Sequence, residues 1–259
     1  MSVLPVILSL ALLGQPADKK ESLELLQKRA EGTSILLFQG RPAGDKGEPA
    51  QLVENPIFRY SDELRDIEDA GIWLWTDHNR PVAALKVERY KPRRFRVPWL
   101  YCFTSLSSDL LRADWPDAVA FAAKKPGITW QPLDDKPAPS RAARLLQMRE
   151  LARRFSAEMF KDKENDRTQM RMLTQPLYRC EESAEVLDGA IFGFTGTGTN
   201  PDLLLLLDLP PKAPWRFAAA GMTAEGVRIK LKEKLVFESP HTAGKGNVFD
   251  TWTNFHPEK

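Results

Sequence analysis

Asn55-Pro56-Ile57-Phe58-Arg59 opens a stretch that runs to Glu88, and Gln175-Pro176-Leu177-Tyr178-Arg179 opens a second stretch that runs to Asp208. The two stretches keep nearly the same spacing between shared residues, which pair as Pro56 with Pro176, Arg59 with Arg179, Asp69 with Asp188, Ile72 with Ile191, Thr76 with Thr195 and Pro81 with Pro201. Chance matches seldom stay in register over such a length. The sequence therefore predicts an internal duplication, and the other assignments are made around it.

The differences between the stretches preserve size and polarity. The substituted pairs are Trp73 with Phe192, Trp75 with Phe194, Phe58 with Tyr178, Val87 with Leu207 and Glu88 with Asp208. A packed interior tolerates hydrophobic exchanges of similar volume far better than changes of polarity. We therefore expect the aromatic residues to pack in a core, in preference to forming an exposed platform for sugars or bases.

Composition limits the classes of partner. At 259 residues and 42% hydrophobic, the chain is long enough to bury a substantial core. Its 37 basic and 35 acidic side chains give a formal net charge of +2, which provides no basic field for nucleic acid. The expected partner is an unknown protein or a component of the cell envelope, and the sequence leaves the oligomeric state open.

The N-terminus has the pattern of an export signal. Residues 1–17 carry no charged side chain, and residues 3–13 form an apolar run that ends at Gly14-Gln15-Pro16-Ala17. This pattern predicts a signal peptide over residues 1–17 and a periplasmic or extracellular protein, with a buried N-terminal segment as the alternative. The run is too short to cross a bilayer core of about 30 Å, and no other stretch approaches a membrane span.

Cysteine and histidine are sparse. Cys102 follows the first stretch and Cys180 lies in the second, at positions that do not correspond. The sequence is compatible with a disulfide between them and with two buried free thiols. His78, His241 and His256 are scattered along the chain. The sequence therefore predicts no metal site and no cofactor.

The chain divides by composition into six parts. After the signal peptide come an N-terminal helix and loop (18–51), a first β repeat (52–138), a linking helix (139–167), a second β repeat (168–238) and a C-terminal tail (239–259) with Trp252 as its only large anchor. The helix is expected over residues 140–160, capped by Ser140, because apolar residues recur there at steps of three and four.

Each repeat has the alternation of several strands. The expected strands are 56–59, 72–76, 82–88 and 99–103, matched by 176–179, 191–195, 203–208 and 215–219, with closing strands at 128–131 and 227–232. The unbroken leucine run at 203–207 predicts a strand that is covered on both faces. The predicted class is α+β, with internally duplicated antiparallel β-meanders joined by an amphipathic helix.

The candidate site residues are few, and each has a structural alternative. Arg59 and Arg179, with Asp69 and Asp188, recur in both copies and form either paired anion or acid sites or ordinary turn and strand contacts. Asp62, Asp77 and His78 form an acid/base group only if the fold brings them together. Residues 196–200 (Gly-Thr-Gly-Thr-Asn) suggest a phosphate loop, but an apolar strand follows where a helix is required, so a hairpin turn is expected.

Three segments carry a resemblance. They are Pro56-Ile57-Phe58-Arg59-Tyr60-Ser61-Asp62, Gly71-Ile72-Trp73-Leu74-Trp75 and Gln147-Met148-Arg149-Glu150-Leu151-Ala152-Arg153-Arg154-Phe155. Together they look like a group of predicted exported bacterial proteins of unknown function, over most of the mature chain. The resemblance implies export, and it implies no activity, fold or site residue.

Three function classes follow. A duplicated chain without a catalytic motif favours a non-catalytic interaction or structural module. The leucine run and the aromatic strands suggest a carrier of an apolar ligand, which requires an open pocket of several hundred Å³. An enzyme would be a carboxylate-dependent hydrolase using Asp62 or Asp69 with Asp188, and Arg59 or Arg179 would stabilise negative charge.

Overall fold

The structure, a computed structural model, describes residues 19–39, 47–92, 97–161, 166–242 and 246–257. It is mostly β, with 48% strand and 12% helix, and its strands form four antiparallel sheets. The predicted α+β class, with an amphipathic helix joining two meanders, is therefore wrong. Most strands of two of the sheets come from segments that the sequence pattern assigns to a helix or leaves without an element; the strand at residues 226–231 is an exception, because a closing strand is predicted at 227–232. The predicted signal peptide, residues 1–17, lies outside the described residues.

The helical elements in the described part are α1 (Lys19–Glu31), the short 3-10 helix η1 (Glu63–Arg65) and α2 (Arg141–Ala152). Strands before α2 are β1 (Ser34–Phe38), β2 (Glu48–Pro49), β3 (Gln51–Leu52), β4 (Phe58–Asp62), β5 (Ile67–Asp77), β6 (Arg80–Tyr90), β7 (Trp99–Ser105), β8 (Leu110–Trp115), β9 (Ala118–Ala122) and β10 (Gln131–Pro132). Strands after it are β11 (Phe155–Phe160), β12 (Arg167–Gln169), β13 (Arg171–Met172), β14 (Tyr178–Arg179), β15 (Asp188–Thr195), β16 (Leu203–Leu209), β17 (Arg216–Gly221), β18 (Gly226–Leu231), β19 (Lys234–Ser239) and β20 (Trp252–Phe255).

The four sheets fall into two matching sets. Sheet A has the order β2-β1-β8-β9, and sheet D has the order β12-β11-β18-β19. Sheet B has the order β20-β7-β6-β5-β3 with β4 also on β5, and sheet C has the order β10-β17-β16-β15-β13 with β14 also on β15. We call residues 19–123 the first half and residues 139–242 the second half; each begins with a helix and contributes one four-stranded and most of one six-stranded sheet.

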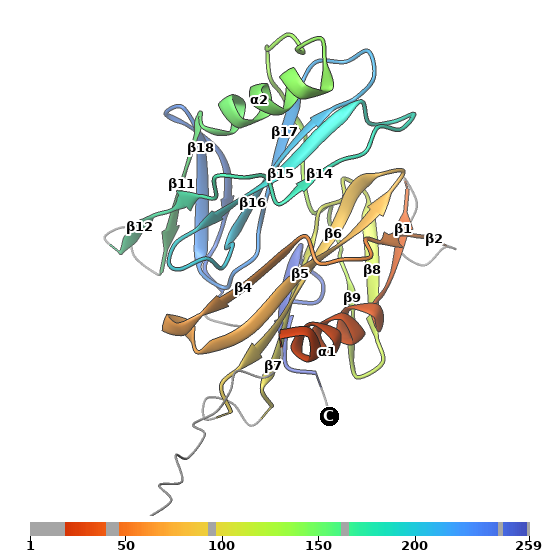
Figure 1. The fold of residues 1–259 in the computed structure, drawn as a ribbon, viewed down its shortest axis with the longest axis vertical. Helices are drawn as coiled ribbons and strands as arrows, with labels where there is room; N and C mark the ends of the chain where they lie inside the picture. Colours follow the sequence, from red (N-terminus) through yellow and green to blue (C-terminus); the bar gives the residue numbers. More distant parts are fainter. Residues whose placement is uncertain (1–18, 40–46, 93–96, 162–165, 243–245, 258–259) are drawn as a thin grey trace, which may run out of the picture.

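Figure 1 shows how the helices and sheets are layered. Three apolar clusters join these layers. One cluster joins α1 and sheet A to the outer face of sheet B, and a second joins α2 and sheet D to the outer face of sheet C. The third lies between sheets B and C and includes Ile72, Leu74, Leu204 and Leu206. All seven residues of β16 are buried, because sheet C is covered on both faces, as the leucine run predicts.

The aromatic residues pack as predicted. Trp73 and Trp75 are fully or almost fully buried against α1 and sheet A, and Phe192 and Phe194 take the matching positions against α2 and sheet D. The Trp73 indole N–H donates to Gln27 Oε1 of α1 at 2.9 Å. The core interpretation of these strands is therefore confirmed, and residues 196–200 form the turn between β15 and β16.

The predicted helix over 140–160 is only partly correct. Ser140 Oγ does cap α2, accepting from the Ala143 backbone N–H at 3.2 Å. The helix ends at Ala152, and β11 then pairs along its whole length with β18. Phe155 and Met159 lie four residues apart, but with Ala157 they also alternate in steps of two, and pairing with an available strand selects the second pattern.

Two further expectations differ from the structure. The closing strand predicted at 128–131 is only the short β10, and it pairs with β17 of the second half at Gln131–Phe217. The tail 239–259, left without structure by its composition, contains β20, which pairs with β7 of the first half. Each half thus receives an edge strand from the chain segment that follows the other half.

Candidate functional site

The first recurring Arg–Asp pair joins a strand, a neighbouring strand and a helix. Arg59 on β4 binds Asp69 on β5 through both carboxylate oxygens, at 2.9 and 2.6 Å. Ser22 Oγ of α1 donates to the same carboxylate. Burial raises the pKa of Asp69, but the hydrogen bonds from Arg59 and Ser22 outweigh burial and leave that pKa below its ordinary value. The carboxylate therefore holds α1 to the edge of sheet B.

The second pair repeats this geometry in the other half. Arg179 on β14 binds Asp188 on β15 at 3.0 and 2.7 Å, and Arg144 Nε of α2 donates to Asp188 at 2.9 Å. The Asp188 side chain has no exposed surface. Burial raises the pKa of Asp188, and the hydrogen bonds from Arg179 and Arg144 lower it further than burial raises it. A charge-paired carboxylate again holds a helix to a sheet.

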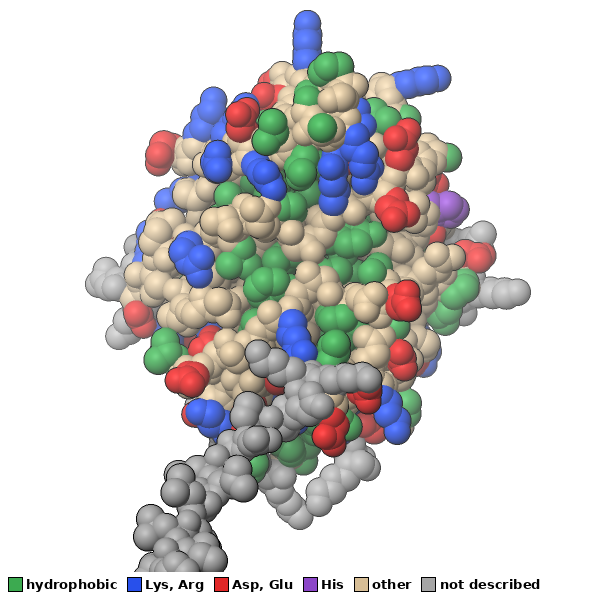
Figure 2. Space-filling model, viewed as in Figure 1, with side chains coloured by type: hydrophobic (Ala, Val, Ile, Leu, Met, Phe, Trp, Pro, Cys, Tyr) green, Lys and Arg blue, Asp and Glu red, His purple; other side chains and the backbone are tan. Residues whose placement is uncertain are grey.

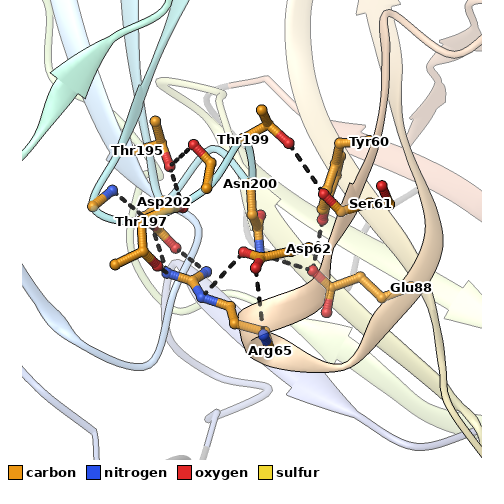
Figure 3. A network of polar contacts seen from close by, with 12 residues as sticks. Tyr60, Ser61, Asp62, Arg65, Glu88, Thr195, Thr197, Thr199, Asn200 and Asp202 are labelled. Atoms are coloured by element: carbon orange, nitrogen blue, oxygen red, sulfur yellow. Dashed lines mark hydrogen bonds and ion pairs between the residues drawn. The ribbon is translucent and has the colours of Figure 1, made fainter.

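Arg65 and Asp202 join the two halves (Figure 3). Arg65, at the end of η1, places its guanidinium on both oxygens of Asp202 at 2.8 and 3.1 Å, and it donates to Thr197 Oγ1 at 3.2 Å. Asp202 is completely buried, and it also accepts from the Gly196 backbone N–H at 3.0 Å. Burial lowers the pKa of Arg65, but the bonds to Asp202 outweigh this and raise it above its ordinary value. The Arg65 guanidinium therefore remains charged.

Glu88 forms a second buried contact between the halves. Its carboxylate accepts from Tyr60 at 2.6 Å and Tyr90 at 2.9 Å, both of the first half, and from Asn200 of the second half at 3.2 Å. Burial is the main cause that raises the pKa of Tyr60 and of Tyr90, and the nearby Glu88 carboxylate raises both further. These hydroxyls therefore stay protonated and serve as donors.

The hairpin between β5 and β6 of the first half likewise contacts acids of the second half. Arg80, at the start of β6, pairs with Glu185 of the second half at 3.0 Å and lies 3.6 Å from Asp208. Asp208 also pairs with Arg216 at 2.6 Å. Burial raises the pKa of Asp208, and here Arg80 and Arg216 lower it by less than burial raises it. Folding therefore disfavours the charged form of Asp208, whereas it favours the charged form of Asp188.

The candidate acids do not converge. Asp69 and Asp188 are each bound within their own half, to Arg59 and Arg179. Asp62 is buried at the start of η1, where its Oδ1 accepts a hydrogen bond from the Arg65 backbone N–H at 3.3 Å and caps this short helix. Asp77 instead accepts from Gln39 at 2.8 Å and contacts His78, whose side chain is 62% exposed. The structure thus brings Asp77 to His78 but places Asp62 in the contact with the second half.

The cysteines are both buried and free. Burial raises the pKa of the Cys180 thiol to about 12, with smaller contributions from nearby Asp208 and Asp188, and burial likewise raises the pKa of Cys102. Neither thiol is poised as a nucleophile. Within the described residues, no group of three or more His, Cys, Asp or Glu side chains is arranged to hold a metal ion.

Two clefts are lined by described residues. A cleft of about 250 Å³ lies where sheet A, the β5–β6 turn and the second half meet; its walls include Asp77, Arg80, Ser107, Trp130 and Glu185. A groove of about 190 Å³ lies between β10 and β19. Both are smaller than the pockets that usually enclose a ligand, which span roughly 300 to 1,000 Å³.

Apolar and basic side chains gather in different parts of one face of the molecule. Figure 2 shows apolar side chains across the middle of this face, in the band between the halves, and Lys and Arg side chains near the end that carries α2. Ile57, Phe58 and Tyr178 of the recurring stretches are half-buried and pack against the central cluster. In the part of the chain that the structure describes, no helix has the length and apolar character needed to cross a membrane.

Sequence reasoning missed Arg65, Asn200 and Asp202. A usable signal was present at Asp202, because a carboxylate directly before five leucines must be buried with a charged partner. The partner lies far away in sequence, and no local pattern points to Arg65. Comparison of the chain with protein-family models, curated proteins and solved structures gave no match.

Proposed function

We propose that this chain is an exported, non-catalytic interaction or structural module whose partner is a protein or an envelope component. The observation that carries the proposal is the bonding of Asp188, which is buried and holds two arginines from different elements. Asp69 has the same kind of bonding. The acids that recur in the sequence are thus committed to holding helices on sheets.

Catalysis by a carboxylate requires a different environment. A general acid at neutral pH needs a raised pKa and reach to a substrate, in a cleft where a second ionisable group converges. The pKa values of Asp69 and Asp188 are lowered, and each carboxylate is occupied by donors of its own half. These contacts favour a structural role over the hydrolase alternative. Neither of these two clefts has the volume that the pocket of an apolar carrier requires.

We also propose that the halves are copies of one ancestral unit of a helix and two sheets. The support is the same strand order in sheets A and D and in sheets B and C. Backbone bonds outside the ladders match as well: Leu106 N donates to Val82 O at 2.8 Å, and Met222 N donates to Asp202 O at 2.8 Å. An experimental structure in which the halves do not superpose strand for strand would contradict the duplication.

Two experiments test the function. Mass spectrometry of protein from its native host should find an N-terminus near residue 18 in an exported fraction, whereas an intact Met1 in the cytoplasmic fraction would contradict export. The purified protein should show no turnover in a broad hydrolase panel. Turnover that disappears in Asp188→Asn, while the melting temperature stays that of the parent, would establish the enzyme alternative instead.

A further inference from the structure

The edge strands β10 and β20 correspond to each other. β20 pairs with β7 through Phe255–Tyr101, and β10 pairs with β17 through Gln131–Phe217. Tyr101 and Phe217 are matched positions in the alignment of the two halves. β10 and β20 are therefore the same element of two repeated units, each of which begins with a helix and ends with this strand. We call them the first unit (residues 19–133) and the second unit (residues 139–257).

The last strand of the second unit is bound by the first unit. Beyond the ladder of β20 and β7, the Ser105 N–H donates to Thr251 O at 2.9 Å. The Phe255 ring meets Tyr101 edge-on at 5.2 Å and Trp115 of β8 at 4.7 Å. Both the backbone and the aromatic contacts of this strand thus cross from one unit to the other.

The last strand of the first unit is bound by the second unit in the same way. The Leu133 N–H donates to Trp215 O at 2.8 Å, and Gln131 Nε2 donates to Val236 O of β19 at 2.9 Å. The Arg216 guanidinium lies over the Trp130 ring, 4.5 Å from its centroid. The exchange is therefore reciprocal, since each unit contributes its last strand to a sheet of the other.

The central interface between sheets B and C is reciprocal as well. Arg80 of the first unit lies 3.6 Å from Asp208 of the second, and Asn200 of the second unit donates to Glu88 of the first at 3.2 Å. Arg80 matches Asn200, and Glu88 matches Asp208. An interface in which matched residues exchange contacts in this way has the form of a twofold dimer.

We propose that the face through which each unit meets the other is a dimerisation surface, and that its partner is a unit of this same fold. The chain is then a strand-exchanged dimer whose two subunits are joined through residues 134–138. Exchange of an identical element is a low-cost route to a dimer, because the contacts of that element are the same whichever chain supplies it. The proposal rests on the duplication proposed above and is independent of export and of catalysis.

The two units have also diverged in a way that selects the pair of unlike units. Asp202 is completely buried and pairs with Arg65 of the first unit at 2.8 Å. Its matched position in the first unit is Val82, as the corresponding backbone bonds show. A pair of two second units would bury both copies of Asp202 without Arg65, and an unpaired buried charge is strongly unfavourable. The second unit should therefore bind a first unit in preference to its own copy.

The test cuts the folded full chain between its units. A site for a sequence-specific protease is inserted between Asp134, which is exposed, and Asp135. The cut protein should elute with the mass of the uncut chain, as measured by light scattering after size exclusion. After unfolding in urea and refolding, native mass spectrometry should again find one copy of each unit in the complex.

Three results would overturn the proposal. They are separation of the units after cutting, refolding into pairs of two second units, and failure of the cut protein to reassemble in a buffer in which the uncut chain refolds. The duplication itself is tested by superposing the halves, so it can stand when this proposal fails.

Two variants test the exchange of strands directly. Asn254→Cys places a thiol opposite the native Cys102 across the ladder of β20 and β7, at a separation that a disulfide can span. After oxidation, the cut Asn254→Cys protein should run as one band of full mass on a non-reducing gel, and Cys102→Ala should abolish that band. Absence of the band in the presence of both thiols would show that β20 is not exchanged.

The second variant is Phe255→Ala, whose ring contacts with Tyr101 and Trp115 cross between the units. In the cut protein it should weaken the association of the units by at least about tenfold in dissociation constant. The same substitution in the uncut chain is the control and should leave a folded monomer. Units of the cut protein that bind each other equally tightly with and without the ring would contradict the proposal.

Discussion

Arg80 and Asn200 occupy matching positions at the tips of two hairpins, and each reaches a buried acid in the opposite half. Asn200 Nδ2 donates to Glu88 Oε1 at 3.2 Å, and Arg80 Nε lies 3.6 Å from Asp208 Oδ1. Glu88 and Asp208 themselves match in the sequence alignment of the two stretches. The two halves therefore bind each other through reciprocal contacts. The Asn200–Glu88 contact is a hydrogen bond from a neutral amide, and the Arg80–Asp208 contact is an ion pair.

The segments that receive these hairpins also correspond in chain order. Thr199 Oγ1 donates to Ser61 O at 3.2 Å, and Ser183 Oγ donates to His78 O at 2.8 Å. Ser61 lies on β4, ahead of β5, and Ser183 lies in the loop ahead of β15, so each hairpin tip contacts the segment that precedes a long strand of the other half. Polar contacts and the central apolar cluster therefore both join the two halves.

Removal of Arg65 should destabilise the protein strongly. Arg65→Ala leaves the fully buried Asp202 without its charged partner, and an uncompensated buried charge typically costs about 3 to 5 kcal/mol. Urea unfolding followed by tryptophan fluorescence would measure the change. Arg112→Ala is the matched control, because its bidentate pair with Asp114 lies on the surface and its loss should leave the unfolding midpoint unchanged. Equal effects of the two substitutions would contradict the proposed role of Arg65.

A side chain at position 198 should destabilise the protein. Its φ is +61°, and a Cβ there would lie 2.9 Å from Asp62 Oδ2. Gly198→Ala should therefore lower the free energy of unfolding by at least about 1 kcal/mol, because an L-residue is strained in this region and the interface carboxylate must move. Gly32→Ala meets only ordinary contacts, the nearest at 3.5 Å, and serves as the control. A harmless Gly198→Ala would show that the turn does not pack against Asp62 as described.

The contribution of Asp208 to stability should depend on pH in the opposite sense to those of Asp69 and Asp188. Because its pKa is raised by folding, the protonated form is favoured in the native state, and its contribution to the free energy of unfolding declines as pH rises through the raised value. Asp208→Asn removes this titration. The variant should lose little stability at pH 7, and the parent should gain on the variant as pH falls towards about 4. Stability curves between pH 3 and pH 7 would reveal this, and the opposite trend would count against it.

The two thiols should be inert in the native state. Cys102 and Cys180 are buried, and their raised pKa values keep them protonated at pH 8. A maleimide reagent should modify neither thiol in buffer and both in denaturant, as counted by intact mass. Detection of a Cys102–Cys180 bridge in the purified protein would contradict the arrangement of β7 and β14.

The sequence predicts the inner part of the fold better than its periphery. Long, regularly spaced strands such as those around Ile72 and Ile191 are predictable because aromatic residues and nearby prolines mark them in both stretches. The sequence predicts a helix where β11 lies, since the apolar spacing of this segment satisfies the helical and the strand period at once. The sequence does not predict β20, because a short edge strand in a polar tail acquires its stability from the strand β7 that it joins, which lies far away in sequence.

The candidate site follows the same division. The repeated Arg and Asp residues pointed to Arg59, Asp69, Arg179 and Asp188, and the structure joins them in two pairs. Their third partners, Ser22 and Arg144, come from helices whose docking depends on tertiary packing. A pattern along the chain therefore identifies the pair but not the role of the pair, which depends on the helix that completes it.

The most direct test of the structural role assigned to these acids is the stability of Asp188→Asn. This change removes the charge that Arg144 and Arg179 bind, so the free energy of unfolding at pH 7 should fall by about 3 to 5 kcal/mol. In a chain of this size the melting temperature should then drop by on the order of 10 °C. Because the pKa of Asp188 is lowered by folding, its stabilisation is fully present above about pH 4 and is lost as pH falls through the lowered value, where parent and variant should converge. Asp114→Asn on the surface is the control and should leave the melting temperature unchanged. A melting temperature for Asp188→Asn equal to that of the parent at pH 7 would contradict the structural role.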